Sequence, residues 1–241
     1  MAYLVLGLVL FLGVHSVRIV ADGWRTQTLA RMGEMPWKGL YSLVSAVGLA
    51  LIVWGYGLAR QQPVVLWVPP IGMRHAAALL TLIAFILLAA TYVPRNAIKA
   101  RLHHPMVLGV KVWALAHLLS NGNLADVVLF GAFLLWAVLD FRAARQRDRA
   151  QNSVYAPATA AGTGIAVVVG TAAWAGFAFW AHVWLIGGAP LGREGSKTVR
   201  RSTICCASRG PLLHGGAETA LPAGVHQSPR AVARRGGCPD Q

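Results

Sequence analysis

The chain has 241 residues, of which 56% are hydrophobic and only 12% are charged. Soluble domains usually carry about 25% charged residues, so this composition excludes an ordinary water-soluble globular domain. The net charge of +14 does not indicate nucleic-acid binding, because the basic residues lie between apolar stretches and not in one water-facing cluster.

Six apolar segments are long enough, or nearly so, to cross a hydrocarbon core about 30 Å thick. They cover residues 2–20, 39–59, 75–93, 106–119, 124–139 and 163–186. The first lacks a basic leading region and a small-residue cleavage site, which predicts an uncleaved helix and not a signal peptide. The fourth is short, so we expect it to begin near Ile98, with Pro105 either kinking the helix or marking its start. The sequence therefore predicts an all-α, polytopic transmembrane bundle of about six spans.

A polar turn of Asn121, Gly122 and Asn123 separates the fourth and fifth segments. Asn123 is predicted to cap the next helix, with Asp126 three residues later completing a weak capping box. Asp126 is therefore interpreted as a helix-start residue in preference to a proton relay.

The orientation in the membrane follows from the basic residues of the loops. The loops after the first, third and fifth segments contain ten Lys and Arg residues, whereas the other two loops contain only Arg60 and Arg74. This distribution predicts that those three loops are cytoplasmic and that the N-terminus lies outside.

The last part of the chain, residues 193–241, differs abruptly from the rest. It holds eight Lys or Arg residues, many Gly and Pro residues, and all three cysteines (Cys205, Cys206 and Cys238). Such a composition predicts disorder, or a reading-frame artefact beyond the natural end of the protein. The sequence thus divides into a transmembrane domain of residues 1–192 and a basic tail of residues 193–241. Because the apolar body has no cysteine, its candidate metal ligands are histidines.

Ionisable side chains inside membrane spans are costly and tend to mark functional sites. Arg18 and Lys111 are able to extend toward headgroups, and His75 and His182 lie near the predicted outer interface, so these four favour a structural interpretation.

His15 and His117 differ from those four, because both lie in apolar stretches of different predicted helices. Neutral imidazole is a common metal ligand, and two histidines from different helices are able to hold a haem iron from both sides. The chain has no CxxCH motif, so such a haem would be haem b. The alternative is that each is a buried histidine bonded to a neighbouring helix. The predicted topology places His15 toward the cytoplasmic side and His117 toward the outer side, so a shared iron requires a tilted or kinked fourth helix.

Several separated motifs, in the same order, resemble those of the NnrU family of bacterial integral membrane proteins. The resemblance covers roughly residues 1–192 and rests on residues 13–19, 24–25, 33–45, 54–57, 92–96, 104–106 and 116–122. It implies a protein of the bacterial inner (cytoplasmic) membrane that is associated with denitrification, near a nitrite or nitric oxide reductase system.

The NnrU family is related to the 15-cis-zeta-carotene isomerases. Those enzymes are similar to haem-b proteins in which two histidines bind the haem iron. The matching positions here are His15 and His117, and the family's His-Pro element matches His104 and Pro105 as a weaker site candidate. The isomerases have a cysteine at the position of Ala114, so ligand exchange from histidine to cysteine is not expected in this chain.

Three functions remain open from the sequence. The first is a haem-b membrane protein of nitrogen-oxide metabolism with His15 and His117 as cofactor and metal ligands. The second is a haem-dependent cis–trans isomerase of a polyene such as a carotenoid. The third is a non-catalytic assembly factor or small transporter in which both histidines are structural.

Overall fold

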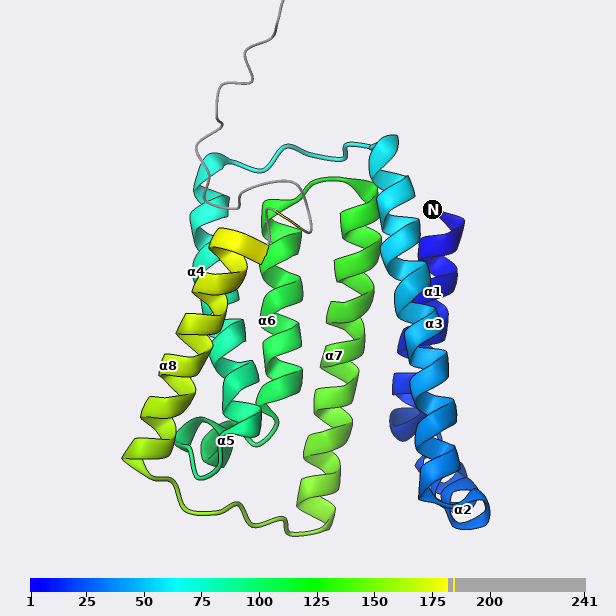
Figure 1. Cartoon of the computed structure of the whole chain (residues 1–241), viewed down its shortest axis with the longest axis vertical. Coiled ribbons are helices and arrows are strands. Elements are labelled where there is room, and N and C mark those ends of the chain that lie inside the picture. Colours follow the sequence, from blue (N-terminus) through cyan, green and yellow to red (C-terminus); the bar gives the residue numbers. More distant parts are fainter. Residues whose placement is uncertain (182–183, 185–241) are drawn as a thin grey trace, which may run out of the picture. The chain divides into compact units, whose positions relative to one another are not determined.

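A computed structural model describes residues 1–181 and residue 184, and it confirms the predicted all-α fold (Figure 1). The helices are α1 (Ala2–Val20), α2 (Asp22–Met32), α3 (Glu34–Gln61), α4 (Ile71–Tyr92), α5 (Ala97–Leu102), α6 (Pro105–Ser120), α7 (Leu124–Ala150) and α8 (Ala160–Gly176). A single π-helical turn, Phe177–Ala181, continues α8. The end of the sixth predicted span, with His182, and the predicted tail lie outside the described residues.

Five helices in this part of the chain are long and apolar enough to cross a membrane: α1, α3, α4, α7, and α8 with its π-helical turn. The remaining predicted crossing, the fourth, corresponds to α6, which is apolar but has only 16 residues and rises about 24 Å. It packs between α4 and α7. These six helices therefore account for the predicted spans.

The start of the fourth span differs from the prediction. Residues Ala97–Leu102 form a separate short helix, which ends at His103 with a left-handed φ of 68°. Pro105 then occupies the first turn of α6, where its missing N–H costs nothing and its fixed φ suits a helix start. The expected start near Ile98 is wrong because the left-handed residue interrupts the helical hydrogen-bond ladder.

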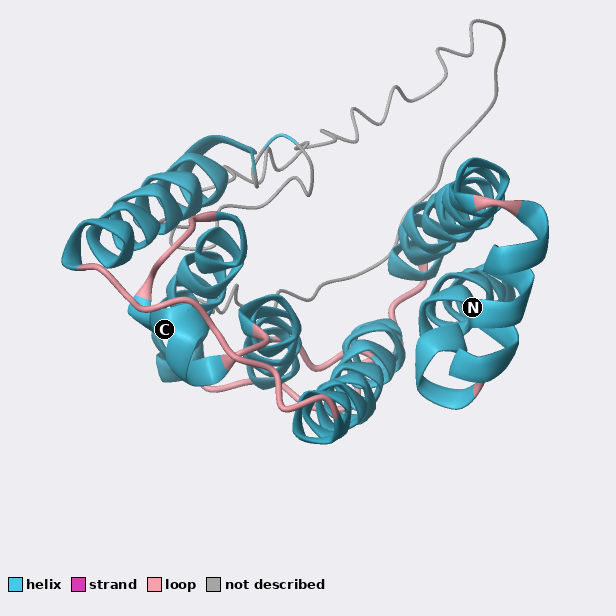
Figure 2. Cartoon of the chain, turned by 90° about the horizontal axis from the view of Figure 1, so that it is seen from below, coloured by secondary structure: helices cyan, strands magenta, loops and turns pink. Residues whose placement is uncertain are grey.

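The spanning helices form a single row in which each packs on the next, in the order α3, α1, α7, α6, α4, α8 (Figure 2). This order differs from the chain order, because α7 returns to pack against α1. Helix α7 therefore joins the α1–α3 hairpin to the rest of the row.

Glycines let α1 and α3 approach closely. A Cβ atom at Gly7 would lie 2.6 Å from the backbone nitrogen of Ile52, and one at Gly48 would lie 2.8 Å from that of Phe11. Small residues at such positions allow helix backbones to touch, which is how helices associate when lipid removes the hydrophobic driving force.

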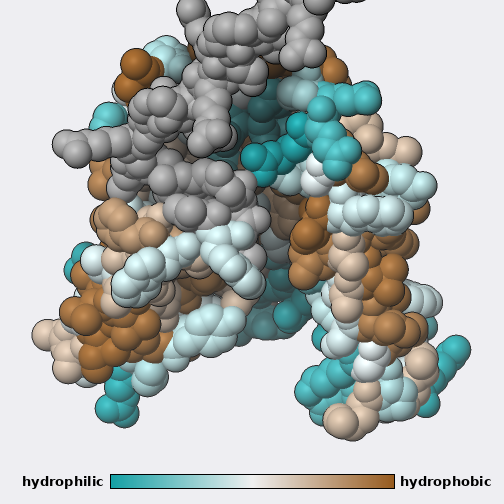
Figure 3. Space-filling model, turned by 45° about the horizontal axis from the view of Figure 1, so that its top comes forward, coloured by the Kyte–Doolittle hydropathy of each residue, from teal (hydrophilic) through white to brown (hydrophobic). Residues whose placement is uncertain are grey.

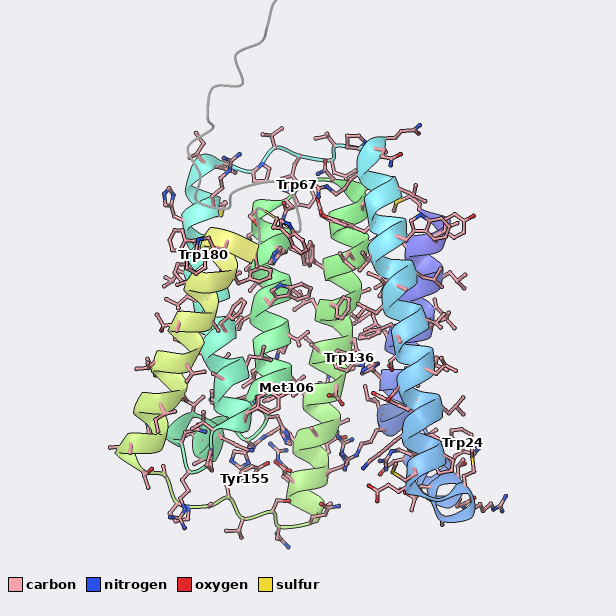
Figure 4. All side chains as sticks on the ribbon, viewed as in Figure 1. Trp24, Trp67, Met106, Trp136, Tyr155 and Trp180 are labelled. Atoms are coloured by element: carbon pink, nitrogen blue, oxygen red, sulfur yellow. The ribbon has the colours of Figure 1, made fainter. Side chains whose placement is uncertain are left out.

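Much of the apolar surface of the row faces outward. Val9 on α1 is 64% exposed, Val53 on α3 is 66% exposed and Val168 on α8 is 67% exposed. Figure 3 shows hydrophobic residues along the flanks of the helices and hydrophilic residues toward both their upper and lower ends. Trp67 lies near one end of the helices and Trp24 near the other, as in the aromatic belts of membrane proteins (Figure 4). The chain is thus an integral membrane protein whose helices use lipid as their solvent.

Candidate intramembrane histidine site

One face of α7 lines its contact with α1. Phe133, Trp136, Asp140 and Arg147 are spaced at three, four and seven residues, so they share that face. The ring of Phe11 on α1 lies 5.9 Å from that of Phe133, measured between centroids. One turn further along both helices, His15 of α1 contacts Trp136 of α7 in the same way, and His15 is a candidate ligand.

His15 lies in an aromatic environment. Its ring stacks on Phe11 at 4.3 Å and lies 5.2 Å from the ring of Tyr41 on α3 and 6.0 Å from that of Trp136 on α7. These rings come from three helices, so the position of the imidazole depends on how α1, α3 and α7 pack.

The hydrogen bond of His15 determines its tautomer. Its Nδ1 atom lies 2.7 Å from the backbone carbonyl oxygen of Phe11. A carbonyl oxygen accepts but cannot donate, so the neutral ring carries its hydrogen on Nδ1 and its lone pair on Nε2. Metal-binding histidines commonly have this second bond to a carbonyl, which orients the ring and makes it a better ligand.

The indole of Trp136, at the edge of His15, has an unmatched donor. Among the described residues, its Nε1 atom is the one buried side-chain nitrogen or oxygen that lacks a hydrogen-bond partner. Trp136 lies partway along α7 and is labelled in Figure 4. A buried N–H without a partner costs about 1–3 kcal/mol.

A small group of charges begins at Asp140, one turn beyond Trp136, and extends to Arg147, about two turns further along α7. Arg147 is 3.9 Å from the Asp140 carboxylate, and its Nη1 atom donates to the backbone oxygen of Arg18 at 3.3 Å. The positive charge of Arg18 also acts on Asp140. The seam between α1 and α7 is thus aromatic around His15 and ionic at the end where α2 lies.

His117 has the same local geometry at a different helix contact, between α6 and α7. Its Nδ1 atom lies 2.9 Å from the backbone oxygen of Trp113, so its hydrogen is also on Nδ1 and its lone pair on Nε2. Its ring stacks on Phe130 of α7 at 4.5 Å and lies 5.2 Å from the ring of Trp113. The sequence therefore identified two histidines that share one tautomer.

Helix α7 separates the two histidines. The α7 partner of His15 is Trp136 and that of His117 is Phe130, six residues away, which is about 9 Å along the helix. The described ring contacts connect the histidines only indirectly, through Phe11, Phe133 and Trp113. The structure places both histidines against α7 at different depths and shows no direct contact between them.

The weaker candidate, His104, belongs to a separate cluster. His103 Nδ1 and His104 Nε2 lie 3.3 and 2.9 Å from the same carboxylate oxygen of Asp148, to which the hydroxyl of Tyr155 also donates at 2.9 Å. Partial burial and the hydrogen bond to Asp148 raise the pKa of Tyr155 to about 12. This cluster ties the turn before α6 to the end of α7 and the loop beyond it.

Asp126 makes a contact that the sequence did not predict. It is only 3% exposed, and its carboxylate accepts from the hydroxyl of Tyr56 on α3 at 2.5 Å and from the amide of Asn123 at 3.0 Å. Asn123 occupies the N-cap position of α7, but its side chain makes no hydrogen bond to a backbone N–H of the helix. The predicted capping box, which needs that bond, does not form. A cavity of about 510 Å³ next to Asp126 contains neither candidate histidine in its lining.

Within the described part of the chain, no group of three or more His, Cys, Asp or Glu side chains is arranged to hold a metal ion. A haem requires less, because its ring supplies four ligands and the protein supplies only one or two axial ligands. The tautomers of His15 and His117 both suit such a ligand, because each ring has its hydrogen on Nδ1, bonded to a backbone carbonyl. His15 in addition contacts aromatic rings from three helices.

Comparisons with known proteins agree with the resemblance in the sequence. The family described as NnrU protein matches residues 3–190, which is most of the chain. No curated protein matches the chain, and no solved structure matches it either.

Proposed function

The chain belongs to the NnrU family, and we propose that it is a haem-b-binding membrane protein that acts in nitrogen-oxide metabolism. The observation that carries the proposal is the geometry of His15: an imidazole inside the membrane with Nδ1 bonded to the Phe11 carbonyl at 2.7 Å. We assign His15 as the residue that would hold the haem iron and His117 as the candidate second ligand.

The protein would hold the haem with residues already in place. The Phe11 carbonyl fixes the His15 ring, and the rings of Tyr41 and Trp136 pack beside it. When bound, haem b supplies electron transfer or a binding position for a small nitrogen oxide. The protein's part is to orient the ligand and to lower the local dielectric. A nitrite or nitric oxide reductase system is the partner that this role implies.

We propose further that the membrane is the bacterial inner membrane and that the N-terminus lies outside. The support is the positive-inside rule, because the end carrying α2, α5 and the loop after α7 holds most of the loop Lys and Arg residues. Fusions of a reporter enzyme that is active only outside the cytoplasm test this orientation. Activity is expected after Gln62 and not after Asn152.

An absorbance spectrum of the full chain, purified in detergent, tests haem binding. A Soret band is expected in the wild type, and it should weaken in His15→Ala. His75→Ala is the matched control, because His75 is exposed near the start of α4. A stoichiometric protein without haem absorbance would contradict the proposal.

The variant His117→Ala decides the second ligand. If both alanine variants lose the Soret band, both histidines bind iron, and α1 and α6 approach each other more closely in the loaded protein. If only His15→Ala loses it, the iron has one protein ligand and His117 serves packing on Phe130.

A further inference from the structure

A cavity of about 510 Å³ lies where the first turn of α7 meets the end of α3. Sites for small molecules in proteins have volumes of roughly 300–1,000 Å³, so this cavity is large enough for a ligand. Its lining has a polar part, with Arg60, Asn123 and Asp126, and an apolar part, with Leu58, Val64 and Leu124.

The loop after α3 holds this cavity in shape. The backbone nitrogen of Leu124 donates to the backbone oxygen of Val64 at 2.9 Å, and that of Leu66 donates to the oxygen of Gly122 at 2.8 Å. These bonds tie the loop to the turn before α7, so the wall that the loop contributes is fixed relative to Asp126. A site formed in advance binds a ligand without the cost of ordering its own chain.

Asp126 supplies a negative charge to the polar part of the lining. One of its carboxylate oxygens accepts from the Tyr56 hydroxyl at 2.5 Å and the other from the Asn123 amide at 3.0 Å. Each oxygen has room for a further hydrogen bond. In the described part of the chain, no cationic side chain forms an ion pair with Asp126. Buried charges are usually paired, so a ligand with an ammonium group suits this carboxylate.

Arg60 gives the same lining a positive charge. Its guanidinium carbon lies 5.9 Å from the centre of the Tyr56 ring, whose hydroxyl bonds Asp126. This charge repels a ligand that carries only an ammonium group and attracts one that also carries an anionic group. The two charges together favour a zwitterion, and the planar guanidinium matches the oxygens of a phosphate.

The apolar part of the lining extends to the outer surface of the protein. Leu58 is 37% exposed and Val64 is 55% exposed, and both line the cavity. Trp67, in the same loop as Val64, lies near this end of the helices, where an aromatic belt meets the headgroups (Figure 4). A lipid headgroup is therefore able to enter the cavity while its chains stay on the apolar surface outside.

We propose that this cavity binds a phosphoethanolamine group, carried by a phospholipid or free in solution, with its ammonium on Asp126 and its phosphate toward Arg60. The inference goes beyond the proposed function and does not depend on haem binding.

Native mass spectrometry of the full chain in detergent tests binding of a short-chain phosphatidylethanolamine. Asp126→Asn keeps the shape of the side chain and removes its charge, so the dissociation constant should rise about tenfold, as expected when a hydrogen bond to a charged group is lost. Asp22→Asn is the matched control, because Asp22 is 49% exposed in α2, at the other end of α3 (Figure 1), and it should bind like the wild type.

A second pair of variants tests the cavity without changing a charge. Val64→Trp should fill the cavity and abolish binding. Val68→Trp is the matched control in the same loop, because Val68 is 84% exposed and lies outside the lining, and it should bind normally. This pair decides the question if Asp126→Asn fails to fold.

The choice of ligand completes the test. Phosphatidylcholine, whose ammonium has no N–H, and phosphatidylglycerol, which has no ammonium, should bind more weakly and should not respond to Asp126→Asn. Competition with O-phosphoethanolamine identifies the source: displacement of the lipid means that the group binds on its own, and no displacement means that the lipid is the ligand. Equal affinity for the three lipids, or wild-type affinity in both Asp126→Asn and Val64→Trp, would overturn the proposal.

Discussion

Replacing Gly7 by alanine should weaken the packing of α1 on α3. The new Cβ would lie 2.6 Å from the Ile52 nitrogen and 2.8 Å from the Gly48 oxygen. Relaxed contacts of a carbon atom lie near 3.5 Å, so the helices must separate by about 1 Å. Both opposing atoms belong to the backbone, so no side chain is able to move aside. Overpacking of this kind costs about 1–3 kcal/mol.

Gly13→Ala is the matched control, because it is the same substitution on the same helix. Nothing lies within 4 Å of a Cβ built at Gly13. Alanine is favoured over glycine in a helix by about 1 kcal/mol, so this variant should be as stable as the wild type or more stable. The two variants should therefore differ by about 2 kcal/mol, with Gly7→Ala the less stable.

Unfolding of the purified proteins in detergent, followed by tryptophan fluorescence, measures this difference. Gly7→Ala should also weaken haem binding, because Tyr41 on α3 lies 5.2 Å from His15 on α1 and moves away as the helices separate. If Gly7→Ala unfolds at the same denaturant concentration as Gly13→Ala, the close approach of α1 and α3 is refuted.

Three further substitutions test polar contacts between side chains and between a side chain and the backbone. Tyr56→Phe should lower the free energy of unfolding by about 1.5–3 kcal/mol, because it removes a hydrogen bond to the buried Asp126 carboxylate; an unchanged unfolding curve would show that the pair contributes nothing. Asn96→Ala should cost about 1–2 kcal/mol, because the 1%-exposed side chain caps α5 and also bonds a carbonyl of α4, and wild-type stability would contradict that role. Asp148→Asn should speed proteolysis of the loop at residues 151–159, because it weakens the bond from Tyr155, and equal cleavage rates would argue against a tether.

The aromatic and polar partners of the candidate site show where sequence reasoning stopped. His15 and His117 stood out because an ionisable side chain in an apolar segment is rare. Trp136 and Tyr41 did not, because a tryptophan or tyrosine in a span is common and only its neighbours give it a role. Asp126 was assigned to a helix start, and its bond to Tyr56 joins residues 70 positions apart, which no local pattern reveals.

The sequence by itself determined the class of protein, the approximate positions of six spans, and the two histidines worth testing. These follow from hydropathy and length, which act locally along the chain. Only the tertiary structure decided the order of the helices in the row, and with it the place of α7 between His15 and His117. Helix order depends on which small and aromatic surfaces fit together, and lipid, which solvates every apolar face equally, does not select among the alternatives.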